Sequence, residues 1–184
     1  RYVVDEQPMA DFSGFKPSFF RFLAELELNN EREWWEENKA RYEEDVREVA
    51  LAFIRAMAPL MAKYNKQLVC SDKKVGGSMI RPYRDVRFSK DKTPFKSHVG
   101  IQFRHKAGKD VHAPGVYVHL HPNEVFVGAG MWRPAGPELK RIRAAIDERR
   151  GAFKKAAHDP AMHKVFSFGG ESLKTSPRGY GADH

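Results

Sequence analysis

The segment 115–132, GVYVHLHPNEVFVGAGMW, decides the fold class of this chain. On both sides of HPNE the residues alternate between apolar and polar or small, which is typical of two strands joined by a tight turn. Consecutive strands with a short connection pair in antiparallel fashion, because parallel strands need a crossover of about a dozen residues or more. The segment therefore predicts an antiparallel hairpin.

Three earlier segments extend this pattern along the chain. They are KQLVCSD (66–72), GGSMIRPYRDVRF (76–88) and SHVGIQFRHK (97–106). Each is an apolar or alternating run bounded by turn residues, so together with the hairpin they predict a mainly antiparallel sheet of about five strands.

Helical patterns precede and follow the predicted strands. Pro17 suits a first helical turn, and a short apolar helix is expected from there up to Asn29 and Asn30. A long helix is expected over residues 30–65 and further helices over 134–159. Helices on both sides of a run of strands favour an α+β fold. We expect one domain over 1–184, with the sheet packed against a long N-terminal helix and C-terminal helices.

Apolar residues at steps of three and four give each predicted helix one buried face. Within residues 30–65, Pro59 should kink the helix or break it. Residues 31–48 contain eight acids and four bases, a local net charge of −4. The expected face of the long helix comprises Trp34, Asn38, Tyr42, Val46, Val49, Phe53, Met57, Leu60 and Tyr64. The expected face of the C-terminal helices comprises Leu139, Ile142, Ile146 and Phe153.

Composition limits the class of protein. The chain has 184 residues, a formal net charge of +8 and a pI of about 9.6, which favours anionic partners. Its single cysteine, Cys70, excludes an internal disulfide and fits a cytoplasmic location. No apolar run reaches the roughly 20 residues of a membrane helix, and the first residues resemble no signal peptide. Because the chain does not begin with Met, we expect leading residues to be absent.

The segment 81–98, RPYRDVRFSKDKTPFKSH, combines cations with aromatic rings. If 81–88 is a strand, alternate side chains share a face. One face would then have Arg81, Tyr83, Asp85 and Arg87; the other, core-facing, would have Pro82, Arg84, Val86 and Phe88. A buried Arg84 needs a carboxylate, which the acidic long helix could supply. Asp85 could orient an arginine fork toward a phosphate or a carboxylate.

The lysines that follow are in excess of the local acids. Lys90, Lys92 and Lys96 cannot all find carboxylates within this segment. The alternative to an anion-binding role is a solvated, salt-bridged hairpin edge, since lysines on edge strands also oppose aggregation.

The histidine pair in HLH is a candidate metal site. His119 and His121 lie on one face of a predicted strand, but two ligands fall short of the three or four protein ligands of a zinc site. We therefore expect no metal, and the sequence names no cofactor. His119, near the cationic segment, is the better candidate for a general acid or base. Cys70 is interpreted as a buried small hydrophobic residue.

Several of these motifs resemble the bacterial domain of unknown function family 2461. They are NEREWWEENKARYE (30–43), GGSMIRPYRDVRFSKDKTPFKSHVG (76–100), PGVYVHLHPNEVFVGAGMW (114–132) and GESLKTSPRGYGADH (170–184). The resemblance covers nearly the whole chain and implies a compact α+β domain with no established reaction, cofactor or partner. It also implies that relatives extend beyond His184, so that the C-terminal end here is incomplete.

The resemblance selects positions in the central segment and in the tail. His121 departs from the family pattern, which weakens a family-wide metal site. In the central segment the matching positions are Arg81, Tyr83, Arg84, Asp85, Arg87, Phe88, Ser89, Asp91, Lys92, Pro94, Lys96 and Gly100. In the tail they are Glu171, Lys174, Pro177, Arg178, Gly179, Asp183 and His184.

Three functions remain open from the sequence. The first is binding, or turnover, of a small phosphate- or carboxylate-bearing ligand, with proton transfer by Tyr83, Asp85 or His119. The second is binding of single-stranded nucleic acid through cations and stacking rings. The third is a protein interaction module, and the oligomeric state is not predicted. The anion-binding residues of the first hypothesis are Arg81, Arg84, Arg87, Lys92, Lys96, Lys174 and Arg178.

Overall fold

The computed structural model describes residues 12–108, 114–169 and 173–181, and it has an α+β fold. The chain divides into two compact units, Arg1–Arg133 and Pro134–His184. The helical elements of the first unit are α1 (Pro17–Leu28), α2 (Arg32–Arg41), the π-helix η1 (Tyr42–Glu48) and α3 (Val49–Tyr64). Its strands are β1 (Leu68–Val69), β2 (Val99–His105), β3 (Gly115–His121) and β4 (Glu124–Gly130).

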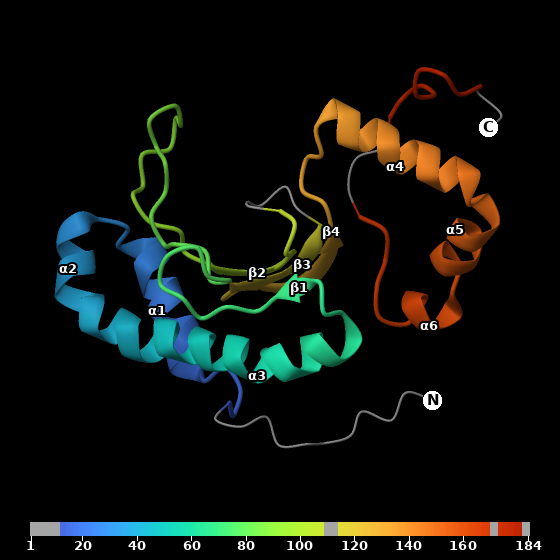
Figure 1. The fold of residues 1–184 in the computed structure, drawn as a ribbon. Helices are drawn as coiled ribbons and strands as arrows, with labels where there is room; N and C mark the ends of the chain where they lie inside the picture. The colour runs from blue at the N-terminus through green and yellow to red at the C-terminus, as the bar shows by residue number, and fades with distance from the viewer. Residues whose placement is uncertain (1–11, 109–113, 170–172, 182–184) are drawn as a thin grey trace. The chain divides into compact units, whose positions relative to one another are not determined.

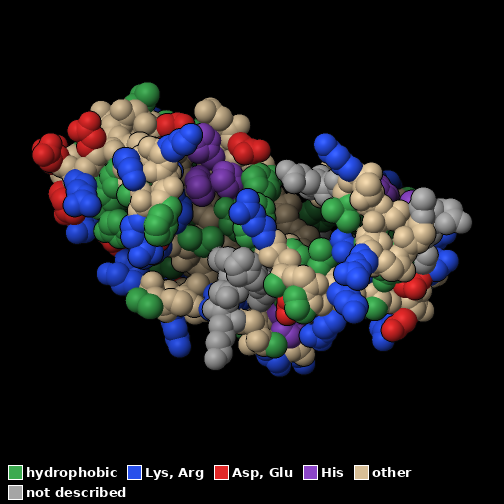
Figure 2. All heavy atoms as spheres, turned by 90° about the horizontal axis from the view of Figure 1, so that it is seen from above, with side chains coloured by type: hydrophobic (Ala, Val, Ile, Leu, Met, Phe, Trp, Pro, Cys, Tyr) green, Lys and Arg blue, Asp and Glu red, His purple; other side chains and the backbone are tan. Residues whose placement is uncertain are grey.

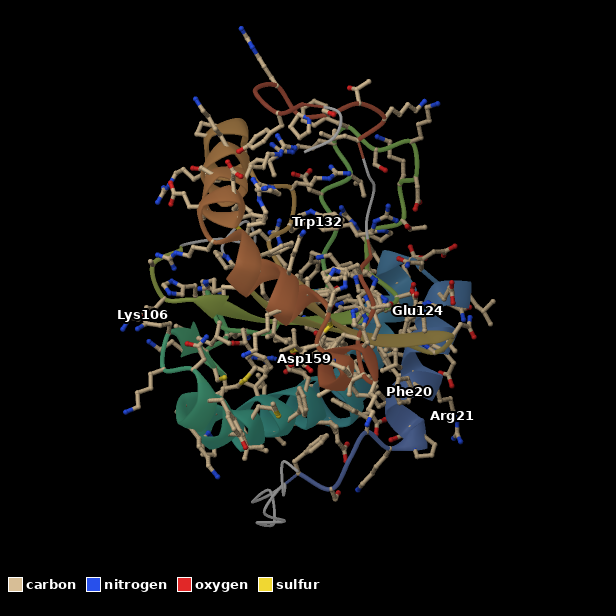
Figure 3. The ribbon with its side chains drawn as sticks, turned by 90° about the vertical axis from the view of Figure 1, so that its right-hand side faces the viewer. Phe20, Arg21, Lys106, Glu124, Trp132 and Asp159 are labelled. Atoms are coloured by element: carbon tan, nitrogen blue, oxygen red, sulfur yellow. The ribbon has the colours of Figure 1, made fainter. Side chains whose placement is uncertain are left out.

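The strands form one antiparallel sheet in the order β1-β2-β3-β4. The predicted hairpin is confirmed, because β3 and β4 pair from His121 opposite Glu124 to Gly115 opposite Gly130. The described residues contain four strands rather than about five. Figure 3 shows Lys106, just beyond β2, and Glu124, at the start of β4, at opposite ends of this sheet.

The missing strand is the predicted one over 76–88. Its backbone pairs with the sheet only near Met79, which bridges to Ile101. After Ile80 the chain leaves the sheet edge and folds back on itself, with Tyr83 bridging Phe95. Proline at 82 and 94 has no N–H to donate, so this stretch cannot form a continuous ladder. The result is an irregular hairpin over 81–96, which rises above the sheet in Figure 1.

The helices of the first unit cover one face of the sheet, as Figure 1 shows. Val99, Ile101 and Phe103 point from β2 into this layer and are at most 3 % exposed. From the helices, Phe19, Phe22, Trp35, Val46 and Ile54 complete the same buried cluster. This burial is the main stabilising contribution to the first unit.

The helical stretch after α1 is not one regular helix. The segment η1 has π-helical geometry, whose i→i+5 hydrogen bonds widen the turn and shift the buried face. After this segment the buried positions include Ala50 and Ile54, each one residue beyond a predicted position. In α2, Trp35 is buried and the Asn38 amide bonds back to the Trp34 carbonyl. Pro59 lies inside α3 without ending it. The first helix of the chain is α1, so the long helical stretch is not the N-terminal element.

The second unit contains α4 (Gly136–Glu148), α5 (Arg150–Ala157) and α6 (Pro160–His163). The predicted face is half-buried at Leu139, Ile142 and Ile146, but Phe153 is 44 % exposed. Arg149 leaves helical geometry between α4 and α5, so the two helices do not continue one stripe. No helix within the described ranges is long and apolar enough to span a membrane.

Asn30 joins the helical layer to the 81–96 hairpin. Its amide nitrogen donates to the Phe95 carbonyl at 3.0 Å, and its amide oxygen accepts from the Phe95 N–H at 3.0 Å. The Trp35 ring stacks on Phe95, with centroids 4.3 Å apart and planes 13° apart. Residue 95 is therefore fixed by two hydrogen bonds and one stacked ring.

Replacing Asn30 with alanine should lower the free energy of unfolding by about 2 kcal/mol, because it leaves both peptide groups of a buried residue without partners. Asn29→Ala is the matched control, since the Asn29 amide bonds only to the neighbouring turn at Glu25, in an exposed position. Urea unfolding of both variants measures the difference. Equal and small losses would show that Asn30 does not fix the hairpin.

Candidate functional site

The hairpin over 81–96 neutralises two of its three arginines, Arg84 and Arg87. Asp91 and Thr93 both accept hydrogen bonds from Arg84. Arg87 forms a bidentate pair with Asp85, from Nε to Oδ1 at 2.9 Å and from Nη2 to Oδ2 at 2.7 Å. This pairing holds the pKa of Asp85 at about 2, well below its ordinary value. Asp85 pairs with an arginine fork, and its orientation of this fork toward a phosphate or a carboxylate stays a prediction.

Two lysines of the hairpin bond to backbone oxygens instead of carboxylates. Lys92 donates to the Val86 carbonyl at 3.0 Å. Lys96 donates to the carbonyls of Arg81 at 2.7 Å and Tyr83 at 3.0 Å. Burial, followed by the charge of Arg81, lowers the pKa of Lys96. The lysine charges are therefore not neutralised by these contacts, and Lys96 fixes the backbone of 81–83.

The predicted two faces of 81–88 do not form. Phe88, expected in the core, is 96 % exposed because the segment is not a strand of the sheet. Arg84 is paired within the hairpin and not with the acidic helix, since Asp91 lies seven residues away in the same turn. The arginines at the tip of the hairpin are thus paired within the hairpin itself.

The sheet face opposite the helices has a cluster of imidazole and phenol groups. His98 and His119 have ring centroids 4.5 Å apart, and the Tyr117 hydroxyl lies 3.1 Å from His119 Nδ1. Phe126 stacks on His119 with planes 11° apart. Figure 2 shows histidine side chains grouped on this face, with cationic side chains nearby.

Burial suppresses protonation in this cluster. It lowers the pKa of His98 to about 4, and the proximity of His119, Lys96, His121 and Arg84 adds to the effect. Burial also lowers the pKa of His119. Both rings are therefore neutral at pH 7 and able to accept a proton or a hydrogen bond.

Sequence reasoning did not select His98 and Tyr117. The signal for Tyr117 was its spacing of two from His119, which places both on one face of a strand. Gly100 completes the arrangement, because a Cβ there would lie 2.9 Å from the Tyr117 hydroxyl. The family-pattern glycine at 100 thus makes room for the Tyr117 ring.

His121 faces Glu27, with Nε2 3.5 Å from the carboxylate. Within the part of the chain that the structure describes, no group of three or more His, Cys, Asp or Glu residues is arranged to hold a metal ion. Cys70 is half-buried, and burial raises the pKa of its thiol to about 11, which disfavours a nucleophilic role.

A cleft of about 690 Å³ lies at the β1/β2 edge of the sheet. Its walls come from α2, η1 and the start of α3 on one side and from residues 73–83 on the other, with Gln102 and Arg104 of β2. Aromatic lining residues are Trp35, Tyr42 and Tyr83. The segment of residues 73–83 follows β1 and runs past the sheet edge toward the hairpin, as Figure 1 shows.

The loop 71–78 that forms one wall is closed at its base by Ser78. This buried residue donates its N–H to the Ser71 carbonyl at 2.6 Å, while its hydroxyl accepts from the Ser71 N–H at 3.0 Å. A Cβ at Gly77 would lie 2.1 Å from the Lys73 carbonyl oxygen, so only glycine fits there. Arg104 donates to the Gly76 carbonyl at 2.9 Å. The loop therefore keeps its two lysines at the cleft.

Cations outnumber carboxylates in the cleft lining. The single acidic lining residue is Glu43, which pairs with Arg47 at 2.6 Å. Lys39 pairs with Glu36 outside the lining at 3.3 Å. Among the described residues, the remaining cations have no ion-pair partner. They are Lys73, Lys74, Arg81 and Arg104.

The structure brings together only part of the predicted site. Arg81 and Tyr83 line the cleft, and Lys96 fixes their backbone. Lys174 and Arg178 are exposed in the second unit, so their participation stays a prediction. Arg84, Asp85, Arg87 and Lys92 lie in the hairpin beyond the lining, and His119 lies on the sheet face. Glu171, Asp183 and His184 are outside the described residues.

The fold and the cleft define a basic α+β protein with a four-stranded antiparallel sheet and a cation-lined edge. A family model described as "Conserved hypothetical protein (DUF2461)" matches residues 18–184. The chain belongs to this family, which confirms the resemblance drawn from its motifs. Neither curated proteins nor solved structures gave a match.

The neutral state of His98 has a consequence for stability. Its folded pKa of about 4 lies below the ordinary 6.5, so between these values the unfolded chain binds the proton and the folded one does not. Stability should therefore decrease as the pH falls from about 6.5 to about 4. In His98→Asn this contribution should be absent, as measured by urea unfolding across the pH range.

His158→Asn is the control, because His158 is exposed in the second unit. It should keep the pH dependence of the parent protein. An unchanged pH dependence in His98→Asn would contradict a suppressed protonation of His98.

Proposed function

We propose that the protein binds a small anionic ligand, phosphate- or carboxylate-bearing, in the cleft at the sheet edge. The observation that supports this is the unpaired excess of cations there: Lys73, Lys74, Arg81 and Arg104 without carboxylate partners among the described residues. Like charges in one cleft repel each other, and a bound anion relieves this repulsion. A volume of about 690 Å³ suits a small organic ligand.

The proposal changes the roles of the predicted residues. Arg81 and Tyr83 contact the ligand, whereas Lys96 orients them through their carbonyls. The tip arginines, Arg84 and Arg87, stabilise the hairpin through their aspartates. Lys92, Lys174 and Arg178 are not among the lining residues, and their contact with the ligand stays a prediction.

Proton transfer is a separate proposal, and its best candidate is His119. The neutral imidazole lies beside Tyr117 and His98 and can accept a proton near neutral pH. With a pKa of about 2, the Asp85 carboxylate is a weak base at neutral pH. For Tyr83 we propose contact with the ligand and no proton transfer.

The stacked tip of the hairpin favours a second candidate function, binding of single-stranded nucleic acid. Phe88 is 96 % exposed, with the Arg87 guanidinium 5.8 Å from its ring centroid, next to Lys90 and Lys92. Exposed rings beside cations bind single strands through base stacking. Such binding would weaken steeply with salt, and Phe88→Ala would abolish it. A protein interaction module and a cytoplasmic location remain proposals from the sequence alone.

Titration calorimetry with inorganic pyrophosphate at low salt tests the cleft. Arg81→Ala should weaken binding by about tenfold or more, since a hydrogen bond to a charged group contributes about 1.5–3 kcal/mol. Arg87→Ala is the matched control, because Arg87 is paired with Asp85 away from the lining and should leave the affinity unchanged.

Two outcomes contradict the proposal. One is the absence of any pyrophosphate binding by the full chain. The other is loss of binding in Arg87→Ala while Arg81→Ala binds normally, which would place the anion at the hairpin tip.

A further inference from the structure

The cleft has two buried aromatic donors at its inner end. Trp35 is 2 % exposed and Tyr42 5 % exposed, with ring centroids 4.7 Å apart, and both line the cleft. Within the described residues, Trp35 Nε1 is closed off from solvent with no hydrogen-bond partner. A buried donor without an acceptor is unfavourable, and a ligand that supplies one removes this cost.

The phenol of Tyr42 acts as a donor. Burial, with the neighbouring Glu43 charge, raises the pKa of Tyr42 well above its ordinary value, so the hydroxyl keeps its proton. Together with the cations, donors predominate among the polar side chains of the lining. A ligand that fits them must have several acceptor oxygens, in an uncharged part as well as in its anionic group.

A partly exposed ring lies between the inner donors and the solvent. Tyr83 is 47 % exposed, and its centroid is 6.0 Å from Trp35 and 5.5 Å from Phe95. Lys96 fixes its backbone through the Tyr83 carbonyl, and Trp35 and Phe95 support the ring from behind. A supported, half-exposed ring offers a stacking surface for a planar group.

The cleft lining therefore has three parts. The cations of the 71–78 loop and Arg81 can bind an anion, the Tyr83 ring can stack on a planar body, and the Tyr42 hydroxyl can donate to an acceptor on that body. Inorganic phosphate would occupy only the first part. A ligand that occupied all three would gain affinity from each.

We propose that the ligand is a phosphate ester of a planar, acceptor-bearing ring, such as a pyrimidine nucleoside monophosphate. This inference rests on the proposed anion-binding function and specifies the ligand class of the same cleft. The phosphate bonds Arg81 and the loop lysines, the ring stacks on Tyr83, and a ring carbonyl accepts from the Tyr42 hydroxyl.

Three probes separate the parts: inorganic phosphate, ribose 5-phosphate and uridine monophosphate. The last two share the sugar and the phosphate and differ in the planar ring. By calorimetry on the full chain, uridine monophosphate should bind about tenfold or more tightly than ribose 5-phosphate, in line with stacking of one base. Tyr83→Ala should remove this difference, so that uridine monophosphate binds no more tightly than ribose 5-phosphate.

Tyr42→Phe deletes only a hydroxyl and keeps the buried ring. It should weaken uridine monophosphate binding by about fivefold or more and leave inorganic phosphate binding unaffected. Tyr83→Phe is the control, since it keeps the stacking ring and should preserve the preference. Circular dichroism and thermal unfolding of each variant verify that the fold is intact.

The results distinguish the two proposals. If phosphate and ribose 5-phosphate bind but uridine monophosphate binds no more tightly, the ligand class is wrong and the anion-binding function stands. If uridine monophosphate is preferred but Tyr83→Ala retains the preference, the ring does not stack in this cleft and the inference is overturned. If none of the probes binds, the proposed function itself fails.

Discussion

Two hydrogen bonds between the Asn30 amide and the Phe95 peptide, with the Trp35 ring stacked on Phe95, are the contact on which the rest of the first unit depends. The 81–96 hairpin has little regular pairing of its own, because its prolines interrupt the ladder. Its position is therefore set by the helical layer. Through Phe95 that layer also positions Tyr83, and through Lys96 it positions the carbonyls of 81–83.

This constraint explains why a strongly cationic segment divides into two electrostatic environments. At the tip, each arginine has an aspartate a few residues away, so local geometry alone satisfies it. At the base, the Arg81 carbonyl accepts from Lys96, and the exposed Arg81 side chain lines the cleft together with the loop lysines. The acidic helical stretch contributes only Glu43 to this lining, and Arg47 already pairs with it. Among the described residues, the arginine of this segment without a carboxylate partner, Arg81, therefore lies at the base.

The sequence predicted those parts of the fold that depend on local periodicity. Alternation over 115–132 specified β3 and β4, and Pro17 marked the start of α1. The prediction of a strand over 76–88 was wrong, because it rested on alternation alone and did not account for the missing N–H of Pro82. The π-helical turn at Tyr42–Glu48 shifts the buried face of the long helix. This shift could not be predicted, because a π-helical turn has no signature in apolar spacing. Pairing of Asp85 with Arg87 was predictable because the partners are two residues apart.

The candidate site was harder to predict because its members are distant in sequence and only tertiary contacts bring them together. Lys39, Lys74 and Arg104 line one cleft, yet each looked like an ordinary surface charge in its own segment. Solvated charges need no partner, so composition alone cannot separate them from charges confined in a cleft. The loop closed by Ser78 and Gly77 places two exposed lysines in the same cleft lining as Arg81. Repulsion between these like charges lowers the stability of the unliganded fold, and a bound anion reverses this loss. A basic net charge thus becomes evidence for a ligand only once the fold brings the charges into one lining.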